Sequence, residues 1–151
     1  MKKLLFIALT IFFVSQSIAD EPLKWYSFNE GLAKAKAEQK ILLVDFYTDW
    51  CGWCKKMDAA TYGNEEVRKL LNDKFVVAKL NPEEQGSVNF NKQTVSQGAF
   101  AQAVQVTGYP TTGFFKNDSV FIGKISGYFE PKQFIEILHS VLKAKEPAKE
   151  Q

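Results

Sequence analysis

Apolar residues along the chain fall into two patterns, which predict where strands and helices lie. Continuous apolar and β-branched runs at residues 41–47 and 75–80 are typical of strands covered on both faces, although the first run contains one acid. Residues 112–116 and 119–125 predict two more strands, joined through an Asn-Asp turn as a hairpin. Segments with apolar residues three and four positions apart lie between these runs and predict helices.

Capping residues mark the expected starts of several helices. Ser27 and Glu30 form a capping box, which predicts a helix through about Glu38. Asn64 is the expected N-cap of an amphipathic helix, and Pro131 suits the first position of the last helix. Two further helices are expected directly after residue 51 and over residues 98–106.

The order of these elements predicts the fold class. Two strands separated by helices, followed by a hairpin and a closing helix, indicate an α/β fold with a mixed central sheet and helices on both faces. Residues 81–97 are polar and rich in Asn, Gln and Ser, so we expect them to form a solvated loop at the edge of the domain.

The N-terminus has the pattern of a signal peptide. Lys2 and Lys3 precede an almost wholly apolar run at residues 4–14, and small residues follow, so cleavage is expected after Ala19. The run is shorter than the ~20 apolar residues that a transmembrane helix needs, and an uncleaved N-terminal anchor is the alternative. We therefore expect a signal peptide at residues 1–19 and no stable membrane insertion after its cleavage.

Length and charge limit what the rest of the chain does. Residues 20–144 suffice for one domain with a single core, and the Lys-, Glu- and Pro-rich residues 145–151 are expected to be a disordered tail. The chain has 19 Lys and Arg against 17 Asp and Glu, and two of these lysines lie in the expected signal peptide. A mature chain without net charge argues against a nucleic-acid partner.

The two cysteines, Cys51 and Cys54, directly follow a predicted buried strand. A disulfide across two intervening residues closes too short a loop to stabilise the fold much, although an exported chain permits disulfides. At a helix start, free backbone N–H groups and the helix dipole favour an anion, so Cys51 is expected to be partly thiolate and to act as the nucleophile. Cys54, one turn further in, would resolve the mixed disulfide, and Gly52 leaves the approach to the first sulfur open.

Four segments resemble the thioredoxin superfamily in the family's own order. These are residues 44–47, 50–55, 77–81 and 106–111, and their spacing follows the family except across one loop. The resemblance covers essentially the whole mature chain and implies a thioredoxin fold and thiol-disulfide oxidoreductase activity. Residues 25–40 and 55–67 are more similar to exported domains of the kind found at the C-terminus of the DsbD-type reductant conveyor than to cytoplasmic thioredoxin.

The resemblance also implies roles for residues away from the cysteines. Pro110 matches the cis-proline that faces the two sulfurs and exposes the backbone of Tyr109 to an extended substrate segment. Asp45 matches the buried acid beneath the inner cysteine, whose pKa burial raises, and would accept the Cys54 proton through water. Lys79 matches the lysine that approaches this acid. The alternatives are a trans-proline turn, an exposed strand edge for the acid and a solvated lysine.

Two tryptophans flank the thiols. Trp50 is expected to line the site and to shield sulfur. Trp53 lies between the cysteines, where thioredoxin has proline and protein disulfide isomerase has histidine, and residues at this place tune the redox potential in the family. Because the chain departs from both patterns, the direction of electron flow stays open.

Two classes of function follow. The first is a periplasmic or otherwise exported enzyme that exchanges the Cys51–Cys54 dithiol or disulfide with thiols or disulfides of exported proteins. Its reductase or isomerase direction is favoured, with a membrane redox partner and no cofactor, and a disulfide-forming oxidase is the alternative. The second is a non-enzymatic module that holds Cu(I) or a partner. A metal site of four ligands is not expected, because the one histidine, His139, lies off the apolar stripe of the last helix.

Overall fold

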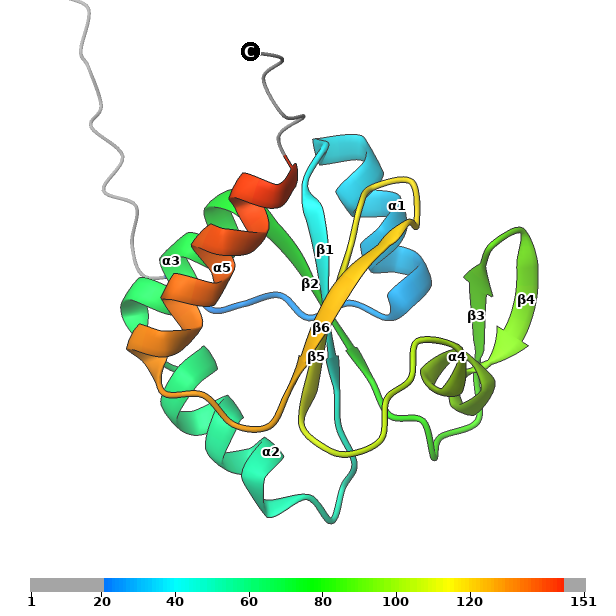
Figure 1. The fold of residues 1–151 in the computed structure, drawn as a ribbon, viewed down its shortest axis with the longest axis horizontal. Helices are drawn as coiled ribbons and strands as arrows, with labels where there is room; N and C mark the ends of the chain where they lie inside the picture. The colour runs from blue at the N-terminus through cyan, green and yellow to red at the C-terminus, as the bar shows by residue number, and fades with distance from the viewer. Residues whose placement is uncertain (1–20, 146–151) are drawn as a thin grey trace, which may run out of the picture.

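The computed structural model describes residues 21–145 (Figure 1). The predicted signal peptide lies outside this range, as does the predicted tail except for its first residue, Lys145, which ends the last helix. Within residues 21–145, no helix combines the length and the apolar character needed to cross a bilayer.

Four strands form the central sheet in the order β2-β1-β5-β6 (Figure 1). β1 (Ile41–Phe46) runs parallel to β2 (Phe75–Leu80) and antiparallel to β5 (Thr111–Phe115), which pairs antiparallel with β6 (Phe121–Ser126). All six residues of β1 are buried, as the continuous apolar run predicts. The predicted mixed sheet is therefore confirmed, with β1 in its interior.

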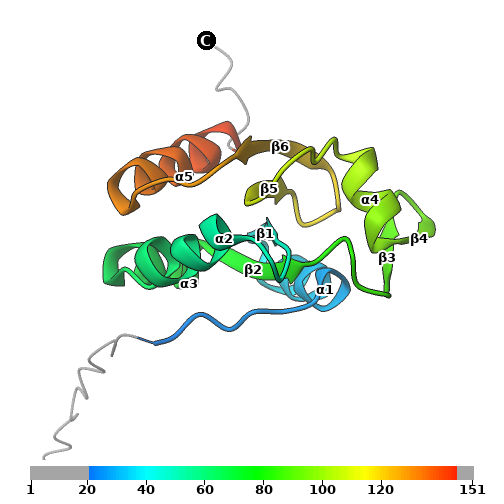
Figure 2. The ribbon, with the colours of Figure 1, turned by 90° about the horizontal axis from the view of Figure 1, so that it is seen from below.

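Helices cover both faces of this sheet (Figures 1 and 2). α1 (Phe28–Glu38) and α4 (Gln97–Ala103) enclose one core, and α3 (Glu65–Lys74) and α5 (Pro131–Lys145) enclose the other. Successive residues of β1 point to opposite faces, so the strand contributes to the two cores in turn. A short helix, α2 (Gly52–Lys56), continues into a π-helical turn, η1 (Met57–Tyr62), which packs in the second core.

The predicted helix caps are confirmed. The Glu30 N–H donates to the Ser27 hydroxyl at 3.4 Å, and the Ser27 N–H donates to the Glu30 carboxylate at 3.2 Å, which completes the capping box. Asn64 caps α3 by accepting a hydrogen bond from the Val67 N–H at 3.2 Å.

The expectation of a solvated loop at residues 81–97 is wrong. Two strands, β3 (Ser87–Phe90) and β4 (Gln93–Ser96), form a separate antiparallel hairpin within this segment. Its two turn residues, Asn91 and Lys92, both have positive φ, which matches the twist of a tight hairpin. Val88 is almost fully buried in the first core, so a short apolar alternation outweighs the polar composition of the segment.

An asparagine from α1 holds this hairpin in place. The Asn29 side chain donates to the Ser87 carbonyl at 3.0 Å and accepts from the Asn89 N–H at 2.8 Å. Both contacts join residues that are far apart in the sequence, so local pattern could not reveal them. The hairpin is therefore docked against the domain.

One helix boundary also differs from the prediction. α4 ends at Ala103, and Gln105, which lies in the range predicted to be helical, has φ 58°. A residue in the left-handed region cannot continue a right-handed helix, so the chain turns there toward the loop before β5.

We expect Ser27→Ala to lower the free energy of unfolding by about 1 kcal/mol, because it removes the cap of α1. Urea unfolding of the oxidised protein measures this change. Ser140→Ala is the control, since that exposed hydroxyl donates only within its own helix, to the Glu136 carbonyl. Equal effects of the two substitutions would contradict the importance of the capping box.

Candidate active site

Cys51 and Cys54 lie where the chain passes from β1 into α2. This short helix leads into η1, which packs in the core that α3 and α5 enclose. They form a disulfide, and Cys51 is the N-cap of α2. The Cys54 N–H points at the Cys51 sulfur, with 3.1 Å between nitrogen and sulfur. This sulfur is the oxidised form of the atom that would carry the thiolate, so a backbone donor already faces the place where that charge would develop.

Both cysteines are buried in this oxidised form, Cys51 with 5% and Cys54 with 3% of its surface exposed. Gly52 lies between them at the surface, and apart from its chain neighbours and the backbone of its own helix no heavy atom lies within 4 Å of the position that a Cβ would occupy there. A side chain at this position would therefore meet no other part of the domain.

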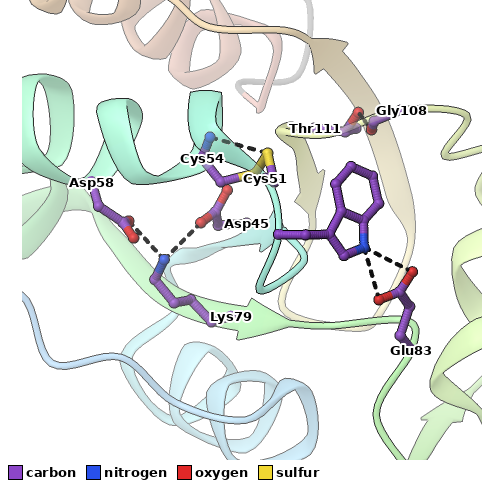
Figure 3. The surroundings of a disulfide bond; sticks show 9 residues. Asp45, Cys51, Cys54, Asp58, Lys79, Glu83, Gly108 and Thr111 are labelled. Atoms are coloured by element: carbon purple, nitrogen blue, oxygen red, sulfur yellow. Dashed lines mark hydrogen bonds and ion pairs between the residues drawn. A yellow bond between two sulfur atoms is a disulfide. The ribbon is translucent and has the colours of Figure 1, made fainter.

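Trp50 stands at one rim of the disulfide with 68% of its surface exposed. Its indole N–H is shared between the two carboxylate oxygens of Glu83, each at 3.1 Å (Figure 3). Its ring meets the ring of Tyr109 edge-on, with centroids 6.0 Å apart. Sequence reasoning missed Glu83, which lies in the segment expected to be an unstructured loop.

Trp53 is 58% exposed and faces a different set of residues. Its ring lies 5.5 Å from the ring of Tyr128, and the Lys56 ammonium nitrogen lies 5.1 Å and 4.5 Å from the two ring centroids. Tyr128, which sequence reasoning also missed, follows Gly127, whose φ of 101° turns the chain after β6. A hollow of about 310 Å³ is lined by Trp53, Tyr109, Pro110, Gly127 and Tyr128.

Pro110 is buried directly before β5, and the Tyr109–Pro110 peptide bond is cis. Two hydrogen bonds fix this loop: the Gly127 N–H donates to the Pro110 carbonyl at 2.8 Å, and the Thr111 hydroxyl donates to the Gly108 carbonyl at 2.8 Å. The structure thus brings the predicted Tyr109 and Pro110 together with Trp50 and Trp53.

Asp45 lies in β1 and is 1% exposed, so the alternative of an exposed strand edge is wrong. Its register partner in the parallel ladder is Lys79 of β2, whose ammonium group donates to the Asp45 carboxylate at 3.0 Å. Burial raises the pKa of Asp45 to about 6, although the positive charge of Lys79 acts in the opposite direction. Figure 3 shows this carboxylate between the disulfide and the Lys79 ammonium group.

Lys79 also contacts a second acid, Asp58 of η1, at 2.7 Å (Figure 3). The ring centroids of Trp25 and Tyr47 each lie 4.9 Å from its ammonium nitrogen. Partial burial alone would lower the pKa of Lys79, but the charges of the two acids outweigh it and the pKa is raised. Sequence reasoning missed Asp58, although its position four residues after Cys54 on a predicted helix could have drawn attention to it.

Comparison with known proteins places the chain among thioredoxin-like proteins. Residues 10–151 match the family model Thioredox_DsbH, described as "Protein of unknown function, DUF255". The chain is 32% identical over 95 residues to Spermatogenesis-associated protein 20 of Mus musculus, covering 59% of this chain and 12% of that protein. It is 27% identical over 113 residues to the Thiol:disulfide interchange protein DsbD of Salmonella typhi, covering 74% of this chain and 18% of that protein. The chain thus spans less than a fifth of these curated relatives.

Two solved structures show the same fold. A thioredoxin from Thermus thermophilus has a TM-score of 0.67 and 25% identity, covering 81% of this chain and 88% of that one. A structure named DsbH Oxidoreductase has a TM-score of 0.63 and 20% identity, covering 87% of this chain and 92% of that one. The predicted thioredoxin fold is confirmed.

We expect Asp45→Asn to stabilise the oxidised protein more at about pH 7.5 than at about pH 4.5. The folded pKa of about 6 lies above the ordinary value of 3.8, so the folded state holds this proton more tightly and loses stability as the pH rises from about 4 to 6. Asparagine stays neutral and avoids that loss, so its advantage should grow by about 2 kcal/mol between the two conditions.

Urea unfolding of the oxidised protein at both pH values measures this difference. Asp73→Asn, at an exposed position on α3, is the control variant. An advantage of Asp45→Asn that is the same at both pH values contradicts a raised pKa for this carboxyl.

Proposed function

The chain belongs to the Thioredox_DsbH family and has the fold of thioredoxin-like disulfide oxidoreductases, and from this premise we propose that it exchanges its Cys51–Cys54 dithiol or disulfide with those of other proteins. The observation that carries the proposal is the disulfide at the start of α2, with the Cys54 N–H directed at the Cys51 sulfur. A structural role explains this pair poorly, because so short a loop adds little stability.

In the reducing direction, the Cys51 thiolate attacks one sulfur of a substrate disulfide. A bond forms between Cys51 and that sulfur, and the other substrate sulfur leaves as a thiolate. The Cys54 thiolate then attacks the Cys51 sulfur, which forms the Cys51–Cys54 disulfide and releases the second substrate sulfur. Two electrons pass to the substrate, and a separate reductant must restore the dithiol.

Cys54 has to lose its proton before the second step, and Asp45 is the group we assign to receive it through water. A carboxyl with a pKa of about 6 is a better proton acceptor near neutral pH than an ordinary aspartate. Before the transfer, Lys79 holds the Asp45 carboxylate by its 3.0 Å contact, and Asp58 binds the same ammonium group; on accepting the proton, Asp45 becomes a neutral carboxyl. The two acids and the lysine thus form one coupled unit below the disulfide.

The rim residues would bind the substrate. Gly52 leaves the approach to sulfur open, and Trp50 and Trp53 border it on two sides. Tyr109 and Pro110 form the facing loop, where the Tyr109 backbone would pair with an extended substrate segment as an added strand does. The substrates we infer are therefore cysteine-containing segments of proteins.

The location and the direction belong to the same proposal. The basic start, the apolar run at residues 4–14 and the small residues ending at Ala19 support export to the periplasm or an equivalent compartment. The similarity to DsbD, named as a thiol:disulfide interchange protein, supports a reductase or isomerase supplied by a membrane redox partner, with a disulfide-forming oxidase as the alternative.

We expect Cys51→Ser to reduce insulin no faster than the buffer, because it lacks the nucleophile. Cys54→Ala should instead accumulate a mixed disulfide with insulin, because no second thiolate releases the substrate. Turbidity with dithiothreitol as the reductant measures the first outcome, and mass spectrometry of an acid-quenched mixture of the reduced variant and insulin without dithiothreitol measures the second. Thr94→Ala, on the exposed hairpin, is the control. Insulin reduction by Cys51→Ser at the native rate overturns the proposal.

Equilibration with a series of glutathione redox buffers tests the direction. A reductase or isomerase should have a potential of about −180 mV or lower, because it has to give electrons to disulfides of exported proteins. The ratio of dithiol to disulfide protein, trapped by alkylation and resolved by mass, gives this potential. A value near about −120 mV identifies an oxidase instead.

A further inference from the structure

Exposed apolar side chains concentrate at the disulfide. Within residues 21–145, three large hydrophobic side chains are exposed: Trp50, Trp53 and Val120. The two tryptophans flank the cysteines, and Val120 lies in the turn before β6. Exposed apolar side chains that gather at one place on a protein mark a surface that contacts another molecule. The residues around the two indoles indicate which group of that molecule they contact.

The surroundings of Trp53 form a wall built from distant parts of the chain. Trp53 belongs to α2, whereas Tyr128 belongs to the segment between β6 and α5, and their rings lie at 34° to each other with centroids 5.5 Å apart. The Lys56 ammonium nitrogen lies over both rings, at 5.1 Å and 4.5 Å. Such a contact between a cation and two rings holds the rings in a defined position.

The hollow beside this wall fits one large apolar side chain. Its volume is about 310 Å³, and three of its five lining residues are aromatic, with Pro110 and Gly127 completing it. This volume lies at the lower end of the ~300–1,000 Å³ that small-molecule sites occupy. Because the rim offers ring faces and few polar groups, an aromatic side chain suits it better than a charged one.

The aromatic surface around the disulfide has two ends, Trp50 with Tyr109 and Trp53 with Tyr128, and different charged residues lie at each. At the Trp53 end lies Lys56, whereas at the Trp50 end Glu83 holds the indole N–H and Asp49 is the preceding residue. Tyr109 lies between the two ends, since it meets the Trp50 ring edge-on and also lines the hollow beside Trp53. The Trp50 end is therefore acidic, whereas the Trp53 end carries the positive charge of Lys56 together with Glu130, which interacts with Tyr128.

We propose that this surface selects cysteines by their neighbours: an aromatic side chain next to the substrate cysteine enters the hollow formed with Trp53 and Tyr128, with an acidic residue near Lys56 and a basic residue near Glu83. The inference rests on the proposed thiol-disulfide exchange and adds the class of substrate. Opposite charges on substrate and protein would orient the segment during the encounter. Tyr128 and Lys56 are then specificity-determining residues outside the Cys-x-x-Cys motif.

Synthetic peptides whose single cysteine is linked to glutathione test the proposal. The dithiol protein converts each one to free peptide thiol and free glutathione and becomes the disulfide itself, so a single turnover balances without another reductant. One peptide carries Phe and Glu on the N-terminal side of the cysteine and Lys on the C-terminal side. A second carries Lys on the N-terminal side and Phe and Glu on the C-terminal side, so that both directions of binding are tested. Each has a partner peptide with Gly in place of Phe.

With the native protein at limiting peptide concentration, one of the two Phe peptides should react about tenfold faster than its own Gly partner. In Tyr128→Ser this ratio should fall to about twofold or less, because the hollow loses one wall. Val120→Ser, which also removes an exposed apolar side chain, should keep the native ratio. A ratio between two peptides within one variant does not depend on how active that variant is.

A second comparison tests the charges. Exchanging Glu and Lys in the Phe peptide should slow the native protein severalfold at low salt, and Lys56→Gln should remove most of this difference. Lys55→Gln is the matched control. It removes the same charge from the neighbouring residue, whereas the ammonium group over the two rings belongs to Lys56.

The outcomes separate this inference from the function beneath it. Exchange with every peptide at a Phe-to-Gly ratio near one in the native protein, or an unchanged ratio in Tyr128→Ser, overturns the inference and leaves the exchange activity standing. No exchange with any peptide that dithiothreitol does reduce overturns the proposed function, and the inference with it.

Discussion

The site depends on a charged group inside a strand that water does not reach. β1 is buried along its whole length, and Asp45 is its one acid, opposite Lys79 in the parallel ladder. Ionising a buried carboxyl is costly, and a single ammonium group at 3.0 Å offsets only part of that cost, so the pKa is raised to about 6. A side chain that could be neutral or charged near physiological pH is thereby held directly below a pair of cysteines.

The strand also determines where the sulfurs lie. β1 is an interior strand, and a short segment leads from its end into α2, so that Cys51 takes the N-cap position and the Cys54 N–H faces its sulfur. The π-helical turn that follows brings Asp58 to the same lysine that Asp45 contacts. One lysine therefore links the strand below the disulfide to the helical turn that follows α2.

The segment between β2 and α4 also supplies a residue beside the disulfide. It folds as a docked hairpin preceded by Glu83, which binds the indole of Trp50. Asn29 of α1 holds the hairpin by its hydrogen bonds to Ser87 and Asn89. The segment after β2 thus places an acid beside Trp50 at one rim of the disulfide, while Lys56 and Tyr128 lie beside Trp53 at the other.

The sequence by itself determined the features that short stretches of chain encode. Caps at Ser27 and Asn64, the buried run of β1 and the cysteine pair depend on neighbours a few residues away, and the resemblance at four segments added Asp45, Lys79 and Pro110. Asp58, Glu83 and Tyr128 could not be predicted in the same way, because their roles depend on contacts with Lys79, Trp50 and Trp53. The tertiary structure alone decided which side chains surround the disulfide. It packs η1, the loop after β2 and the turn after β6 around the two cysteines, and contact between such distant segments is a property of the folded chain.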